Sequence, residues 1–177
     1  DFESAGRELR RYEACFGKSA YLEGCLLIGK REIEQAISVL STEFESRKSE
    51  HVGEMLTQAL IDANRLNEAL TVCSDPVMER SAGAVYQRIQ DKAFHSSSYQ
   101  TSAMAGRLAF EKDRDPAVAY NIGCALARDG QVDESLEWIA CAVEAGFEDK
   151  ALISSDPDID ALRGLPEFDL IFEKLSK

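Results

Sequence analysis

Apolar side chains recur along most of the chain at the three- and four-residue spacing of an amphipathic helix. A clear case is the set Val132, Leu136, Ile139 and Val143, whose spacing places all four on one side of a helix. This period favours helices over strands. We therefore expect an all-α fold.

The helical segments repeat every 33 residues. Steps of 33 residues back from Leu126, Val132 and Leu136 reach apolar or small residues in each earlier unit. A fourth column always holds a small residue, namely Ala36, Ala69, Ser102 and Ser135. Because a bulky side chain would hold two crossing helices apart, this column predicts where paired helices cross closely. A fixed period of this length indicates a repeat architecture.

Each unit is predicted to be a pair of helices joined by a short turn. The expected pairs are residues 18–29 with 33–45, 50–62 with 66–74, 78–93 with 98–112, and 116–128 with 132–145. Turn-prone residues fall between paired helices at equivalent places, in Asp129-Gly130, around Asn64 and in the serine run at Ser97. Pro76 is expected to shorten the second helix of the second unit.

A further helix is expected before the first pair, over residues 3–16. Leu9, Tyr12 and Phe16 lie on one of its sides, and we expect that side to pack on the first pair. The chain starts with Asp1 rather than Met, which predicts that it is a piece of a longer protein. A targeting signal would then lie upstream of it.

The pattern changes after the fourth pair. Short segments that begin with Pro157 and Pro166 follow there, and proline is tolerated in the first turn of a helix. We expect residues 146–177 to cover the apolar face that an end repeat would otherwise expose. On this interpretation residues 1–177 form a single domain, with the four helix pairs at 17–145.

The fourth unit resembles the tetratricopeptide repeat. The resemblance rests on Ala119 to Leu126, on Gly130, on Asp133 to Glu137 and on Ala142. It implies a right-handed α-α superhelix of about four helix hairpins of about 34 residues each, with a leading helix and a C-terminal capping segment. The third unit departs from the family pattern, with Gln90 where glycine is usual. Ankyrin repeats share the period, but the sequence lacks their Thr-Pro-Leu-His signature.

Composition narrows the classes of function. The chain has 32 Asp and Glu against 20 Lys and Arg, which gives a net charge of −12. That charge opposes the phosphate neutralisation that drives nucleic-acid binding, and it favours a basic or neutral protein partner. An equally good interpretation is that the acidity only keeps the chain soluble. The sequence has no apolar run of 18 residues or more, so no membrane association is expected.

The chemistry-bearing residues predict neither an enzyme nor a metal site. The chain has an odd number of cysteines and no CxxC pair, which indicates reduced thiols and a cytoplasmic location. The cysteines are Cys15, Cys25, Cys73, Cys124 and Cys141. His51 and His95 do not lie at ligand spacing from them. The sequence shows no nucleophile with a base and no phosphate loop, so we predict no catalysis and no cofactor. Asp156 and Asp158 are interpreted as helix caps or as partners of the helix dipole.

The resemblance also implies where a partner binds. In the family, the first helix of each pair lines a concave groove, and set positions of that helix face the ligand. Carried over, they predict as partner-binding residues Lys18, Tyr21, Leu22, His51, Glu54, Met55, Gln58, Gln87, Arg88, Tyr120, Asn121 and Cys124. Acidic residues, Glu54 and Asp91, separate the basic positions, so we expect no clamp for the C-terminal carboxylate of a chaperone.

Three functions remain open from the sequence. The leading hypothesis is an adaptor or scaffold that binds a peptide or helix of a partner protein in this groove. A second is the non-catalytic regulatory domain of a larger enzyme. A third is a helical module that forms homo-oligomers through its ends or its convex face. Because a fold of this type hosts many functions, the architecture does not name a pathway.

Overall fold

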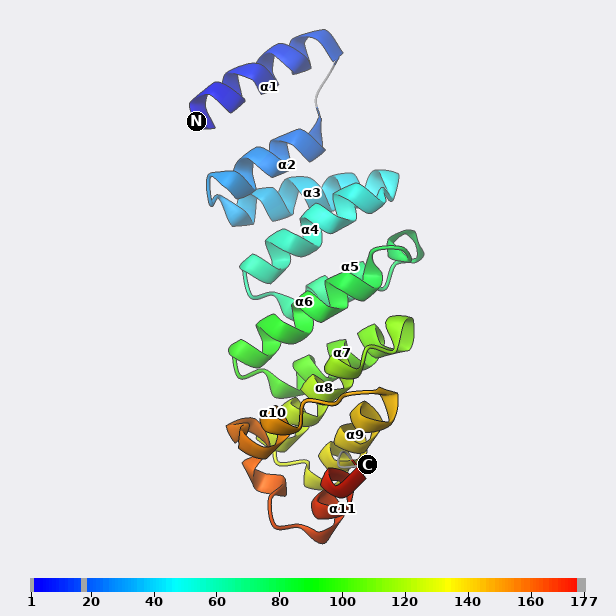
Figure 1. Cartoon of the computed structure of the whole chain (residues 1–177). Helices are drawn as coiled ribbons and strands as arrows, with labels where there is room; N and C mark the ends of the chain where they lie inside the picture. Colours follow the sequence, from blue (N-terminus) through cyan, green and yellow to red (C-terminus); the bar gives the residue numbers. More distant parts are fainter. Residues whose placement is uncertain (1, 17–18, 175–177) are drawn as a thin grey trace. The chain divides into compact units, whose positions relative to one another are not determined.

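The computed structural model describes residues 2–16 and 19–174. Within these ranges every regular element is a helix and no strand occurs, which confirms the all-α prediction. The helices divide between two compact units, Asp1–Val85 and Tyr86–Lys177, with the boundary inside α6 (Ala82–His95). The expectation of a single domain stays a prediction, and each unit is described by itself (Figure 1).

Unit 1 contains two helix pairs and the leading helix. Its elements are α1 (Phe2–Phe16), α2 (Ala20–Gly29), α3 (Ile33–Arg47), α4 (Glu50–Asp62), α5 (Leu66–Cys73), the short 3₁₀ helix η1 (Pro76–Met78) and the start of α6. α2 packs on α3 and α4 packs on α5, as predicted, while α1 packs on α2. α5 ends at Cys73, shortly before Pro76, so the second helix of this pair is short for the expected reason.

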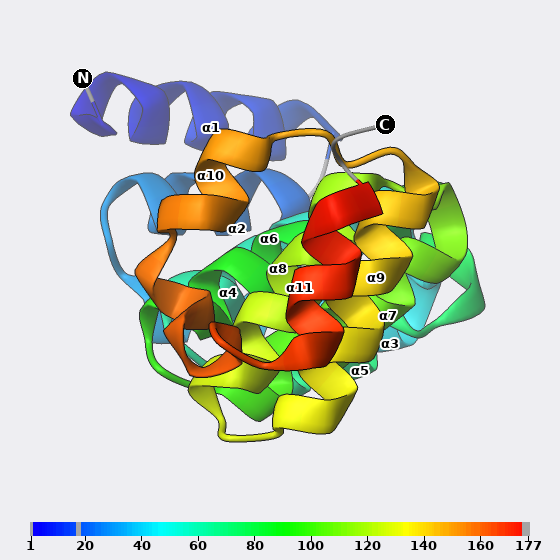
Figure 2. The same cartoon turned by 60° about the horizontal axis from the view of Figure 1, so that its bottom comes forward.

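Unit 2 contains the rest of α6 and the chain that follows. Its further elements are α7 (Tyr99–Asp113), α8 (Pro116–Arg128), α9 (Val132–Ala145), α10 (Lys150–Ser155), the 3₁₀ helix η2 (Pro157–Leu162) and α11 (Pro166–Lys174). α8 packs on α7 and α9, η2 packs on α8, and α11 lies beside α9 (Figure 2). The proline-started segments η2 and α11 therefore lie over the last helix pair.

The 33-residue period is visible in the backbone of the turns. The residue after the C-cap of each first helix has a positive φ, between 58° and 82°, at Arg31, Asn64, Ser97 and Gly130. The next residue in each case donates its N–H to the carbonyl of the residue five positions earlier, as in Gln131 N to Leu126 O at 2.9 Å. This is the hydrogen bond of a Schellman motif, which satisfies a free carbonyl at a helix end. The turn-prone positions expected from the sequence are thus confirmed.

The small-residue column lies where paired helices cross. All four members are 0% exposed: Ala36, Ala69, Ser102 and Ser135. Where the small residue is serine, its hydroxyl donates to a backbone carbonyl of the facing helix. Ser102 Oγ bonds Gln90 O at 2.9 Å, and Ser135 Oγ bonds Gly123 O at 2.7 Å. The close crossing leaves no unpaired hydroxyl at these two sites.

Gln90 departs from the family pattern without disrupting the crossing. Its side chain is 1% exposed, and its Nε2 donates to Val118 O at 3.2 Å. Space for it comes from α7, where a Cβ atom on Gly106 would lie 2.9 Å from Gln90 Cδ. The third pair therefore exchanges the sizes of the two facing residues and keeps the fold.

Candidate partner-binding surfaces

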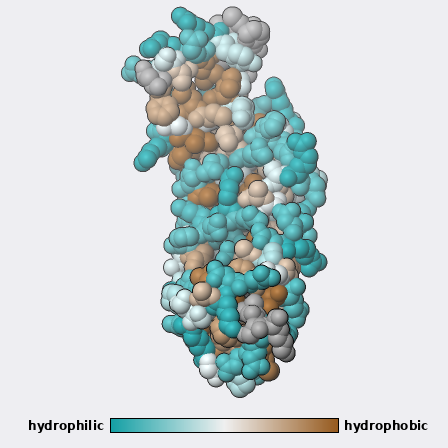
Figure 3. Space-filling model, in the orientation of Figure 1, coloured by the Kyte–Doolittle hydropathy of each residue, from teal (hydrophilic) through white to brown (hydrophobic). Residues whose placement is uncertain are grey.

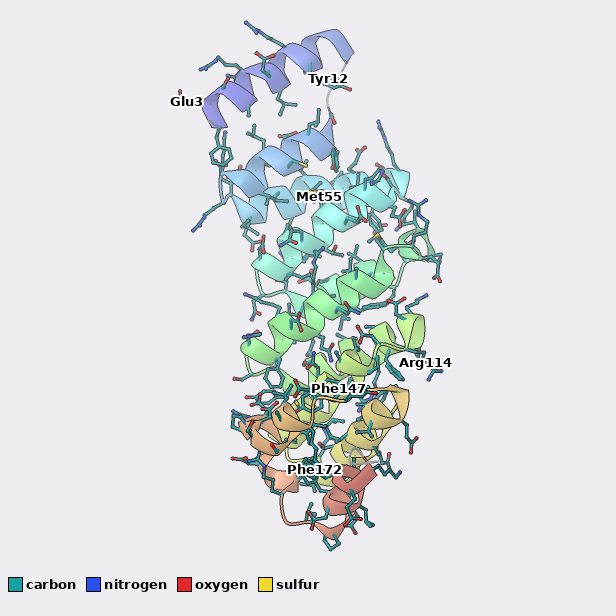
Figure 4. All side chains as sticks on the ribbon, in the orientation of Figure 1. Glu3, Tyr12, Met55, Arg114, Phe147 and Phe172 are labelled. Atoms are coloured by element: carbon teal, nitrogen blue, oxygen red, sulfur yellow. The ribbon has the colours of Figure 1, made fainter. Side chains whose placement is uncertain are left out.

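In unit 1 the predicted binding residues lie on α2 and α4. Tyr21 and Leu22 of α2 are 38% and 37% exposed, which is unusual for large apolar side chains in this chain. Met55 of α4 is half-buried (Figure 4). Lys18, the remaining predicted residue at this end, lies outside the described residues. The exposed apolar groups make this face of unit 1 a candidate contact surface.

The polar residues predicted on α4 contact other side chains of the same helix. His51 Nδ1 lies 3.6 Å from Glu54 Oε2, and Gln58 Nε2 donates to Asp62 Oδ1 at 2.8 Å. Such contacts between residues one turn apart at the surface of a helix are weak and readily exchanged for contacts with a ligand. These side chains are therefore available to a partner.

In unit 2 two predicted binding residues are covered, which corrects the prediction. Tyr120 and Cys124 of α8 are only 3% and 4% exposed. Tyr120 Oη donates to Asp156 Oδ2 at 2.8 Å, and its ring stacks on Phe147, which is labelled in Figure 4, with centroids 4.4 Å apart. Cys124 Sγ lies 3.9 Å from the same carboxylate oxygen. The chain's own C-terminal segment occupies the place that the resemblance assigned to a ligand.

The covering segment also keeps these two groups protonated. Burial raises the pKa of the Tyr120 hydroxyl and of the Cys124 thiol far above their ordinary values, and the negative charge of Asp156 acts in the same direction. A thiolate is the form of cysteine that acts as nucleophile, so Cys124 has the opposite of a catalytic environment. Asp156 Oδ1 accepts the N–H of Asp158 at 2.9 Å, which confirms its interpretation as a cap.

A pocket of about 420 Å³ lies between α6, α8 and the C-terminal segment. Asp91 and His95 line it from α6, Asn121 lines it from α8, and Asp156 and Asp158 line it from the C-terminal segment. Cys124 also lines the pocket from α8. Of these residues, Asn121 and Cys124 were predicted to bind a partner, and the resemblance placed Asp91 among the groove positions. Gln87 and Arg88, also predicted on α6, do not line the pocket, although Arg88 is exposed.

The pocket carries an excess of negative charge. Three of its lining side chains are aspartates, and one of them, Asp158, accepts from Arg128 Nη1 at 3.0 Å. Loss of hydration raises the pKa of Asp91, and nearby His95 opposes that shift. His95 Nδ1 itself lies 2.7 Å from Asp91 O. The arrangement attracts a cationic group, because the single arginine offsets only part of the carboxylate charge.

Sequence reasoning missed most of this pocket for a physical reason. Asp91 and Asp156 lie far apart along the chain, and only the return of the C-terminal segment over α8 brings them together. No local spacing signals that return. His95 was visible only as an isolated histidine beside a serine turn.

Among the described residues, no group of three or more His, Cys, Asp or Glu is arranged to hold a metal ion. None of the described helices combines the length and the apolar character needed to cross a membrane. The cysteines whose side chains are described are all free thiols: Cys25, Cys73, Cys124 and Cys141.

Comparison with known sequences gives one short match. No family model matches the chain. A chloroplastic protein of Arabidopsis thaliana is 32% identical over 59 residues, which make up 33% of this chain and 18% of that protein. The match thus spans less than a fifth of the length of the relative.

Comparison with solved structures concerns the whole chain. YrrB, described as a TPR protein with an unusual peptide-binding site, gives a TM-score of 0.51 at 14% identity, over 99% of this chain and 92% of that chain. The MamA RS-1 ArsTM double mutant gives a TM-score of 0.49 at 17% identity, over 86% and 90%. The first likeness supports a shared fold, and the turns and crossings described above repeat with the same period. The chain has a tetratricopeptide-repeat-like fold.

Proposed function

We propose that the chain is a non-catalytic adaptor that binds an extended segment of a partner protein, with the pocket of unit 2 receiving a basic side chain of that segment. The negative lining of the pocket is the observation that carries this proposal. Asp91 and Asp158 offer carboxylate oxygens and Asn121 offers an amide oxygen. Lysine and arginine carry several N–H donors and no acceptor, so they match such a lining.

Size and overall charge support the same class of partner. A volume of about 420 Å³ is at the small end of ligand sites and suits one long side chain with its adjoining backbone. The net charge of −12 favours encounter with a basic segment. YrrB is described as having a peptide-binding site, which supports peptide binding here only by analogy of fold.

The predicted residues of unit 1 form a second proposed contact surface, which is described by itself. Tyr21 and Met55 supply apolar contact area, and large aromatic and methionine side chains are common anchors in interfaces. The polar residues around them supply hydrogen bonds at the edge. The proposed set in unit 1 is Tyr21, His51, Glu54, Met55 and Gln58. In unit 2, Gln87 and Arg88 of α6 are proposed to add polar contacts. Tyr120 is buried and is not part of the proposal, whereas Cys124 belongs to it only as part of the pocket wall.

A displayed library of random peptides tests the proposal. Peptides selected on the wild-type chain should be enriched in Arg and Lys, and their affinity should fall at least about tenfold for Asp91→Lys. Glu111→Lys is the matched control, because Glu111 is exposed on α7, does not line the pocket, and its replacement makes the same change in charge. Selection without a basic preference, or equal loss in both variants, would contradict the proposal.

The same proteins separate the alternative functions. A module that forms homo-oligomers predicts a mass that rises with concentration in analytical ultracentrifugation and no selected peptide. A regulatory domain predicts capture of an enzyme that the Asp91→Lys variant loses. We also propose a reducing compartment such as the cytoplasm, supported by the free thiols at the four described cysteines.

A further inference from the structure

The leading helix α1 shares the two crossing residues of α3, the second helix of the first pair. With a shift of 31 residues, Ala5 and Leu9 align with Ala36 and Leu40 of α3. α1 is also followed directly by α2, the first helix of a pair, just as α3 is followed by α4. By pattern and position, α1 therefore corresponds to the second helix of a pair, and no described helix takes the place of a first helix beside it.

The counterparts of this apolar face are buried in every complete pair. Ala36 and Leu40 are both 0% exposed, because α2 lies over them. On α1 the same face is open. Ala5 is exposed, and the apolar neighbours Phe2 and Tyr12 are 53% and 45% exposed. Figure 3 shows hydrophobic surface gathered over α1 and α2, near the top of the view.

The open face forms one wall of a slot between α1 and α2. The slot has a volume of about 470 Å³, and Ala5, Leu9 and Tyr12 line it from α1 while Leu22 and Cys25 line it from α2. α2 itself occupies an equivalent seat, because it packs on α3, the second helix of its own pair, and on α4, the first helix of the next. The slot between α1 and α2 thus corresponds to the position that a first helix occupies between the second helix of its own pair and the first helix of the next pair.

The lining of the slot is apolar. Among the described residues, its one charged lining side chain is Glu8, which accepts from Arg11 Nη1 at 2.8 Å on α1 itself. The described lining therefore presents no unpaired charge to an occupant. The main favourable contribution to the free energy of binding is therefore the burial of the apolar side chains of the slot against an apolar surface of the occupant.

The complete pairs show which residue the occupant needs at the crossing. A Cβ atom on Gly24 would lie 2.6 Å from Leu40 Cγ, and one on Gly123 would lie 2.8 Å from Ile139 Cγ1. A large residue on the second helix is thus faced by glycine on the first. Because Leu9 stands at the position of Leu40, the occupant needs glycine opposite Leu9.

We propose that the slot between α1 and α2 binds an amphipathic helix of a partner protein, with glycine at the crossing and apolar residues on the same face. A second copy of the chain is a poor source of that helix. Its four first helices already bury their crossing residues within their own pairs: Gly24, Thr57, Gln90 and Gly123. This site takes a helix through apolar contact, and it is separate from the pocket proposed for a basic side chain.

A synthetic peptide of residues 115–129, with Cys124 replaced by serine and a fluorescein label, is a suitable probe. It contains the chain's own example of such a helix, including the cap Asp115 and the crossing residue Gly123. Binding to the whole chain is measured by fluorescence anisotropy. We expect binding to the wild-type chain and at least about tenfold weaker binding of a Gly123→Leu peptide, which overfills the crossing.

Two chain variants place the binding in the slot. Ala5→Arg should weaken binding of the probe at least about tenfold, because it puts a charge into the apolar wall. Ser4→Arg is the matched control, since Ser4 is exposed on α1 and does not line the slot. Both replacements are at exposed positions, so unchanged circular dichroism is expected. Bound probe should also slow maleimide labelling of Cys25, which lines the slot.

Several outcomes would overturn the proposal. Equal binding of the probe to Ala5→Arg and wild type would remove the slot as the site. Dimers of the chain alone that Ala5→Arg abolishes would make a second copy the occupant. Loss of probe binding in a longer natural chain would make a preceding segment the occupant. Asp91→Lys should leave probe binding unchanged, so failure here and failure of the proposed function are distinguishable.

Discussion

The helices α8 and α1 each have an apolar face that is not covered by the other helix of a pair. The face of α8 is covered by the C-terminal segment, whereas the face of α1 is open among the described residues. Over α8 the C-terminal segment returns and buries Ile153, Ile159 and Leu162 to 0% exposure. Over α1 no described segment returns, and Phe2 and Tyr12 remain about half exposed. An apolar face covered by its own chain contributes to stability, whereas an open one is available for recognition.

Substitutions in the C-terminal segment that covers α8 should have the largest effect on the free energy of unfolding. Leu162→Ala should lower the free energy of unfolding by about 2–5 kcal/mol, because it leaves a cavity under η2. Leu170→Ala makes the same change on α11 at a side chain that is 62% exposed, and it should stay within about 0.5 kcal/mol. Urea denaturation followed by circular dichroism measures both. Equal losses would mean that η2 does not bury its leucine as described.

The hydrogen bond beneath the segment has a smaller expected effect. Tyr120→Phe should cost about 1–2 kcal/mol, because Asp156 loses a buried donor while the ring remains stacked on Phe147. A double-mutant cycle with Asp156→Ala isolates the pair, since the cycle removes effects that the two residues do not share. Fully additive losses would show that this bond does not hold the segment.

The open end should show the smallest effect. Leu9→Ala is expected to cost less than about 1 kcal/mol, because its side chain is already half-exposed in the slot. Leu40→Ala, at the equivalent repeat position but 0% exposed, should cost about 2–5 kcal/mol. Thermal unfolding of the two variants compares them directly. A large loss for Leu9→Ala would mean that the face of α1 is covered in solution.

The sequence by itself determined the repeat and its local geometry. α4, α8 and α9 begin and end where the apolar period predicts, and the small-residue column lies at the crossings. The turns also follow the period, with positive φ even where Arg31 and Ser97 replace glycine. These features are local, since each depends on spacing within one helix or on the turn that ends it.

Only the tertiary structure decided what each face of the repeat meets. The sequence placed Tyr120 and Cys124 in a binding groove, and the return of η2 over α8 buries them instead. The same return brings Asp156 and Asp158 to Asp91 and creates the acidic pocket. Packing brings together residues that lie far apart along the chain. A periodic pattern predicts where each helix lies in the sequence, but it does not specify which segment covers that helix.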